Sequence, residues 1–206
     1  MTDYSRTLRA MQRHPVVYLT GAPATGKTSV ARYLVERFGA RRYSYGEALS
    51  HKMQDQGYSH EDLRTQSGAI IKRQLIAELD AQMPDQVQLW VRDGPVVIDT
   101  HAVTSERWGL RSIPYSAEVL RAIGATHLVC LSAGAGTLQA RIKSDSGGRP
   151  VESEVKLAQL EQAQIAVLLA YAHTLGGSAF IVDANRPLGD VQRDVAALCG
   201  LEAAAG

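Results

Sequence analysis

The most informative segment of this chain is Gly21-Ala22-Pro23-Ala24-Thr25-Gly26-Lys27-Thr28, which fits the phosphate-binding pattern G-x-x-x-x-G-K-[ST] at every fixed position. The apolar run Val16-Val17-Tyr18-Leu19 precedes it and predicts a buried strand, and residues 29–38 predict a helix. A strand, a glycine-rich loop and a helix form the context in which this pattern binds phosphate. The alternative is a strand-to-helix turn with a chance lysine, and the flanking elements favour phosphate binding.

Each part of the loop suits a bound nucleotide. The two glycines let the backbone curl so that successive N–H groups point at phosphate oxygens, and the N-terminal end of the next helix adds positive potential. Lys27 would reach the outer phosphates, and the hydroxyl of Thr28 would bind magnesium. The predicted nucleotide-binding residues are the loop and the residue after it: Gly21, Ala22, Pro23, Ala24, Thr25, Gly26, Lys27, Thr28 and Ser29.

The bulk properties favour one domain and a small-molecule ligand. The chain has 206 residues without a Pro/Gly/Ser-rich linker, so we expect a single domain over residues 1–206. A formal net charge of +1 leaves no bulk electrostatic reason for nucleic acid or an anionic membrane as the main partner. With neither a span-length apolar stretch nor a secretory leader in view, we expect a cytoplasmic protein. Cys130 and Cys199 are expected to be inert core thiols.

Apolar runs alternate with helical patterns along the chain. Such alternation predicts an α/β fold with a doubly wound, five-stranded parallel sheet, because parallel strands need crossover helices on both faces. The predicted strands are residues 16–19, 42–45, 96–99, 127–131 and 179–183. The predicted helices are residues 29–38, 46–56, 60–82, 114–123, 136–145, 152–175 and 187–198, with Met83-Pro84 ending the third helix and a loop over 100–113.

A carboxylate at the end of the predicted third strand is the second chemical signal. Asp99 closes the run Val96-Val97-Ile98, where a ligand for magnesium is expected opposite the phosphate loop. A strand-end turn is the alternative for Asp99. Asp93 also lies near this strand, but Asp93-Gly94-Pro95 is a turn signal. His101 is expected at the same rim, either at the acceptor or in a structural hydrogen bond.

Two segments outside the sheet are candidates for closing over the reactants. Residues 46–83 form a helical arm, in which Gly46 and Arg64 are candidates for binding the acceptor, although a charge on such a helix is usually solvated. Residues 141–151 form a glycine-rich segment flanked by Arg141 and Arg149, which we interpret as a lid that excludes water from the phosphates. For Arg141 the alternative is an i,i+4 ion pair with Asp145.

Taken together, these motifs resemble the archaeal type of adenylate kinase, a branch of the P-loop nucleoside monophosphate kinases. The run from Val96 to His101 is similar to that family's apolar strand ending in Asp-Thr-His. Leu138 to Arg141 matches the start of its short lid, and Tyr45-Gly46 matches the entry into its monophosphate-binding arm. The resemblance spans residues 16–183. Lys27 is a departure, because the archaeal loop often lacks this lysine.

The resemblance implies transfer of the γ-phosphoryl group of ATP to AMP, with magnesium as cofactor. Because phosphoryl transfer needs the charge on the phosphates neutralised, we expect catalytic roles for Lys27, Arg141 and Arg149, and magnesium binding by Thr28 and Asp99. The resemblance also implies self-association, because that branch commonly forms trimers.

Two other functions stay open. The acceptor could be another small molecule in a specialised pathway. Alternatively, the domain could be a nucleotide-dependent switch or assembly ATPase that acts on a macromolecular partner. No Asn-Lys-x-Asp motif for guanine is present, so adenine is the default base of the donor.

Overall fold

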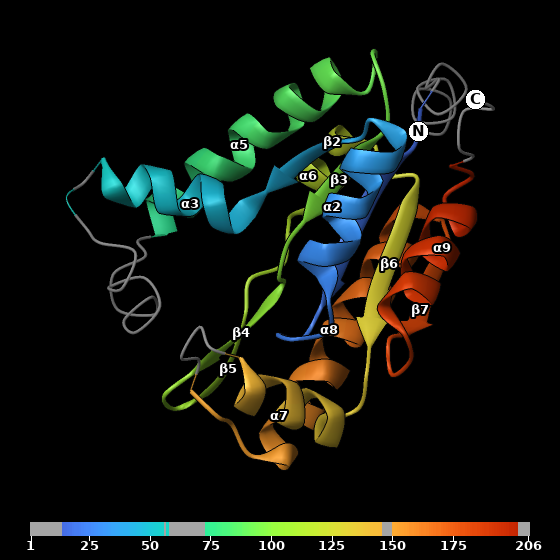
Figure 1. Ribbon diagram of the computed structural model, residues 1–206. Coiled ribbons are helices and arrows are strands. Elements are labelled where there is room, and N and C mark those ends of the chain that lie inside the picture. Colours follow the sequence, from blue (N-terminus) through green and yellow to red (C-terminus); the bar gives the residue numbers. More distant parts are fainter. Residues whose placement is uncertain (1–13, 56, 58–72, 146–149, 202–206) are drawn as a thin grey trace.

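The computed structural model describes residues 14–55, 57, 73–145 and 150–201. Its centre is a five-stranded sheet in the order β2-β3-β1-β6-β7, and every neighbouring pair is parallel (Figure 1). The strands are β1 (Val16–Gly21), β2 (Arg41–Ser44), β3 (Val96–Asp99), β6 (His127–Ser132) and β7 (Ala179–Asp183). This confirms the predicted doubly wound α/β fold.

Helices cover both faces of the sheet, and alternate residues of each central strand serve the two faces. Val17 and Leu19 of β1 pack in a core cluster with α2 (Lys27–Phe38) and α9 (Leu188–Leu198). Val16 and Tyr18 pack in the other cluster, with α5 (Arg73–Trp90), α6 (Ala117–Ile123) and the later part of α8 (Glu154–Leu175). Because both faces are buried, the central strands are continuously apolar rather than alternating.

The carboxyl ends of the five strands meet at one edge, where the glycine-rich loop also lies. Asp99 is paired in register with Leu19 on one side and with Ser44 on the other. Two further helices begin at this edge: α3 (Tyr45–Gln54), capped by the Ser44 hydroxyl, and α7 (Ala135–Ser144). In such sheets ligands bind outside the carboxyl ends of the strands.

The arm differs from the sequence prediction at Pro84. The predicted helix over 60–82 should end at Met83-Pro84, but α5 continues through Pro84 to Trp90. A proline inside a helix costs about 3 kcal/mol because one backbone hydrogen bond is lost. Met83 and Val87 are fully buried against the sheet, and this packing offsets the cost. Residues 58–72 lie outside the described part of the chain, so the start of this predicted helix does too.

The prediction of a loop over 100–113 is also wrong, because this segment contains an antiparallel hairpin. Strands β4 (Val103–Glu106) and β5 (Gly109–Ser112) pair with each other, and Gly109 has φ +151° after the tight turn. The hairpin is attached to α8: the ammonium of Lys156 donates to the carbonyl of Glu106 at 3.0 Å. Helix α6 likewise begins at Ala117, after the Ser116 cap, rather than at Pro114.

Two expectations about exposure can be compared with the structure. Cys130 and Cys199 are both buried and unbridged, as predicted for core thiols. Among the described helices, none combines the length and the apolar character needed to cross a membrane.

Candidate functional site

The glycine-rich loop follows β1 and has a backbone that its sequence explains. Gly21 has φ +147°, and a Cβ placed there would lie 2.5 Å from the carbonyl oxygen of Leu131. Gly26 has φ +94° and caps the N-terminus of α2. Ala24 also has positive φ, at 64°, which is rare outside glycine and marks a constrained loop. The hydroxyl of Thr25 closes the turn by donating to the carbonyl of Ala22 at 2.8 Å.

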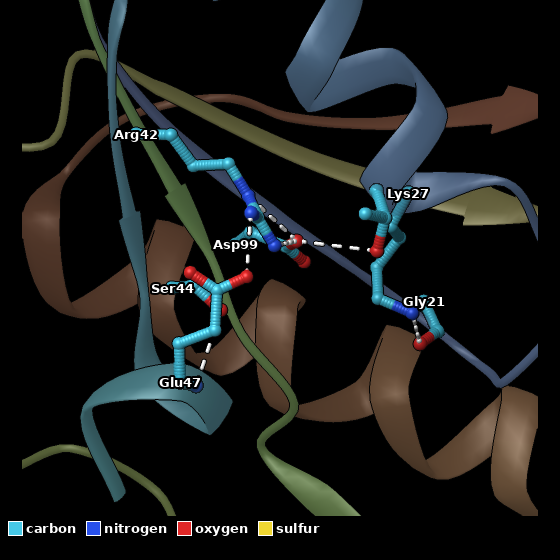
Figure 2. A network of polar contacts seen from close by, with 7 residues as sticks. Gly21, Lys27, Arg42, Ser44, Glu47 and Asp99 are labelled. Carbon is cyan, nitrogen blue, oxygen red and sulfur yellow. Dashed lines mark hydrogen bonds and ion pairs between the residues drawn. The ribbon is translucent and has the colours of Figure 1, made fainter. Parts of the chain in front are cut away.

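Lys27 lies folded against this loop rather than in solvent. Its side chain is buried, and Nζ donates to the carbonyl of Gly21 at 2.8 Å (Figure 2). Nζ also donates to the carbonyl of Ala22 at 3.2 Å. A cavity of about 270 Å³ opens beside it. The cavity is lined by loop and helix residues together with one histidine: Pro23, Ala24, Gly26, Lys27, Thr28, Ser29 and His101. The structure therefore places His101 at the phosphate loop, and its role at the acceptor stays a prediction.

The two predicted magnesium ligands face each other. The Thr28 hydroxyl donates to Oδ2 of Asp99 at 3.4 Å, and Asp99 is only 5% exposed. A hydroxyl and a carboxylate beside a phosphate cavity are oxygen ligands of the kind that Mg²⁺ takes together with nucleotide phosphates and water. In the part of the chain that the structure describes, no three His, Cys, Asp or Glu side chains are grouped to hold a metal ion by themselves. Asp93, the rejected candidate, forms an exposed ion pair with Arg41.

Arg42 is a site residue that the sequence analysis missed. From β2, its Nε and Nη2 donate to Asp99 Oδ2 at 3.2 and 2.8 Å, and Nη1 donates to Glu47 at 2.8 Å (Figure 2). Burial by itself lowers the pKa of Arg42, but the hydrogen bonds and charges of Asp99 and Glu47 outweigh it and raise this pKa. A charged residue inside a predicted strand was the available signal. Its partner, however, is set only by the pairing of β2 with β3.

On the other side of the loop, Arg141 joins two segments that are distant in the sequence. From α7, it donates to the carbonyl of Ala24 at 3.3 Å and to the carbonyl of Ala184 at 2.9 Å. These contacts border a second cavity of about 260 Å³. Its lining combines the loop, α7, and the segment after β7: Ala24, Thr25, Gly26, Arg141, Ala184, Arg186, Leu188 and Val191. Arg186 is a second cation that the sequence analysis missed. Arg149 and the centre of the predicted lid lie outside the described residues.

On the arm side, Gly46 lies in the first turn of α3, at the carboxyl edge of the sheet. The Tyr45 hydroxyl donates to Asp80 of α5 at 3.0 Å and so ties the two helices together. Burial raises the pKa of Asp80, and the hydrogen bond from Tyr45 opposes that shift. Arg64 lies outside the described residues. Tyr115 is buried with its ring centroid 5.9 Å from that of Tyr45, whereas Trp108 is 74% exposed at the turn of the hairpin.

Comparison with known proteins places most residues of this site within a known family. A family model described as AAA domain (AAA_17) matches residues 20–158, which is more than half of the chain. The chain belongs to this AAA domain family. The match begins one residue before the glycine-rich loop and includes Asp99, Arg141 and the start of α8.

Relatives of this AAA domain include archaeal kinases. The adenylate kinases of Pyrococcus abyssi and Pyrococcus furiosus are each 25% identical over 162 residues, covering 76% of this chain and 80% of the relative. Among solved structures, a sugar kinase from Janibacter sp. HTCC2649 matches with a TM-score of 0.57 at 16% identity, covering 91% of this chain and 95% of its own. A gluconokinase from Sinorhizobium meliloti matches with a TM-score of 0.51 at 18% identity, covering 90% and 94%. Together with the strand order, these matches show a P-loop kinase fold.

Proposed function

We propose that this protein transfers the γ-phosphoryl group of ATP to a small-molecule acceptor, and that the acceptor is a nucleoside monophosphate such as AMP. The observation that carries the proposal is the cavity lined by the glycine-rich loop, buried Lys27 and Thr28, with buried Asp99 accepting a hydrogen bond from Thr28 at 3.4 Å. The archaeal relatives named adenylate kinase support AMP as the first acceptor to test.

The roles of the residues follow from the charge that phosphoryl transfer must neutralise. Backbone N–H groups of the loop residues other than Pro23 and the ammonium of Lys27 would bind the β- and γ-phosphate oxygens of ATP. Thr28 and Asp99 would hold magnesium, which neutralises phosphate charge when bound. Arg141 and Arg149 would contact the transferring group from the predicted lid. With these groups preorganised, no covalent intermediate on the protein is required.

The base of ATP would lie in the second cavity, between Arg141 and the segment after β7. The apolar side chains of Leu188 and Val191 line that cavity, and the guanidinium of Arg186 offers a planar cation for stacking. On the opposite side, Gly46, Arg64 and His101 are the proposed acceptor contacts. The donor and the acceptor would then approach the phosphate loop from its two sides.

A coupled assay of ADP formation with a panel of acceptors tests the proposal. The panel contains AMP and other monophosphates, nucleosides, gluconate and other small hydroxyl compounds. We expect AMP to raise turnover well above basal ATP loss, and Lys27→Met to abolish that turnover. If no acceptor raises turnover, the kinase proposal fails; if hydrolysis instead responds to a macromolecular partner, the switch or assembly ATPase takes its place. A response to a hydroxyl acceptor alone would replace AMP with that acceptor.

We also infer that residues 1–206 form a single domain with an arm over 46–83 and a lid over 141–151, that the protein is cytoplasmic, and that it assembles as a trimer. The trimer rests on the family resemblance. Light scattering coupled to gel filtration would give the mass directly, and a monomer at assay concentration would contradict the trimer.

A further inference from the structure

A single carboxylate oxygen, Oδ2 of Asp99, accepts hydrogen bonds from two residues, Thr28 of the phosphate cavity and Arg42 of β2. Thr28 Oγ1 lies 3.4 Å away, and Arg42 contributes both Nε at 3.2 Å and Nη2 at 2.8 Å. A carboxylate oxygen has about two lone-pair positions, so these donors occupy the side of Asp99 that faces Thr28. That is the side on which a metal ion held jointly by Thr28 and Asp99 would lie.

Arg42 therefore competes with a metal ion for Asp99 by position and by charge. A metal ion bound directly to Oδ2 would require the guanidinium to withdraw. A metal ion bound through a water molecule would still lie close to a positive charge. Since Asp99 is 5% exposed, solvent screens this repulsion weakly.

The guanidinium has a second partner that could keep it in place when it leaves Asp99. Its Nη1 donates to Glu47 Oε1 at 2.8 Å, and Glu47 is fixed in the first turn of α3, where its backbone N–H donates to Ser44. Glu47 is 64% exposed, so its own charge is largely screened from the cavity. The net local effect of Arg42 is thus to cancel the charge of Asp99.

We propose that Arg42 is the internal counter-ion of Asp99, which keeps metal affinity low until a nucleotide arrives, so that the divalent cation enters together with the nucleotide. The nucleotide phosphates then supply negative charge in place of the Asp99 charge that Arg42 cancels. Arg42 is a positioning residue in this scheme, and the inference rests on the proposed function, in which Thr28 and Asp99 hold the metal.

Titration of the full-length protein with Mn²⁺, followed by electron paramagnetic resonance of the free ion, tests this without measuring activity. In the absence of nucleotide, we expect Arg42→Gln to bind Mn²⁺ at least about tenfold more tightly than the wild type, because a nearby unit charge is removed. Arg42→Met provides a second uncharged variant, and Arg42→Lys should keep the weak binding. Arg41→Gln is the matched control, since Arg41 is on the same strand but pairs with Asp93 at the surface.

Asp99→Asn separates failure of this inference from failure of the metal site. The tighter Mn²⁺ binding of Arg42→Gln should disappear in the double variant that also carries Asp99→Asn. Asp99→Asn alone should weaken Mn²⁺ binding to the ADP complex. If Asp99→Asn weakens that binding but both uncharged Arg42 variants bind Mn²⁺ like the wild type, the counter-ion role is wrong and the metal site stands. If Asp99→Asn leaves the ADP complex unchanged, the metal assignment is wrong and the counter-ion role falls with it.

Discussion

The Thr20 hydroxyl donates to Oε1 of Gln164 at 3.0 Å, between two side chains that are almost completely buried. The amide Nε2 of Gln164 in turn donates to the carbonyl of Val103 at 2.8 Å. Thr20 immediately precedes the glycine-rich loop, and Val103 begins the hairpin. Gln164 therefore ties the base of the phosphate loop to the hairpin through α8.

Gln164→Leu should lower the free energy of unfolding by about 1–3 kcal/mol, because the Thr20 hydroxyl and the Val103 carbonyl would lose a buried partner. Urea denaturation followed by circular dichroism measures the change. Gln162→Leu is the matched control on the exposed face of the same helix and should change stability little. Equal effects from the two variants would show that the buried link does not stabilise the fold.

Gly21→Ala should destabilise the protein by more than about 2 kcal/mol and weaken nucleotide binding, since the added Cβ would meet the Leu131 carbonyl at 2.5 Å. Gly136→Ala is its control, because nothing lies within 4 Å of the added Cβ and the residue is in α7. Alanine favours a helix over glycine, so the control should be neutral or slightly more stable. Thermal unfolding and calorimetric titration with ADP measure both effects. A Gly21→Ala protein as stable as the control would contradict the close approach.

Arg141→Ala should weaken ADP binding about tenfold, because the guanidinium braces Ala24 of the loop against Ala184 beside the second cavity. Arg141→Lys should not restore binding, since an ammonium lacks the planar fork that reaches both carbonyls. Lys143→Ala on the same helix is the control; its ammonium contacts Gln139 at the surface. Wild-type affinity in Arg141→Ala would remove Arg141 from the nucleotide site.

The cysteines give a prediction about pH. Burial raises the pKa of Cys130 and of Cys199 to about 12, from an ordinary value of 9.0. The folded protein then retains protons that the unfolded chain releases above pH 9, so the free energy of unfolding should decrease between pH 9 and 12. At pH 8, a thiol reagent should label neither cysteine in the native protein and both in urea. Rapid labelling of the native protein would contradict the burial of these thiols.

Most of the sheet and the phosphate loop could be predicted from the sequence because their signals are local. The pattern around Lys27 specifies a strand, a loop and a helix within a short segment, and the apolar runs of the central strands are continuous. The prediction of Asp99 beside Thr28 also needed only the rule that parallel strands end at one edge. The family match confirms a P-loop domain, whereas the catalytic and acceptor roles of individual residues stay predictions.

The wrong predictions for α5 and for the hairpin have a common physical cause: contacts with distant elements outweighed the local sequence signal. Pro84 signals the end of a helix locally, yet α5 continues because Met83 and Val87 are buried against the sheet. The hairpin over 103–112 carries a weak strand pattern and depends on Gln164 and Lys156 of α8.

By itself, therefore, the sequence determined that this chain forms a parallel α/β domain with a phosphate-binding loop, because backbone geometry and apolar patterning act over neighbouring residues. Only the tertiary structure decided which charges meet at that loop. Arg42 and Asp99 are 57 positions apart and come together because β2 pairs with β3; Arg141 reaches Ala24 across 117 positions. Pairings of this kind depend on strand order and register, which bring distant residues together in ways that no local pattern records.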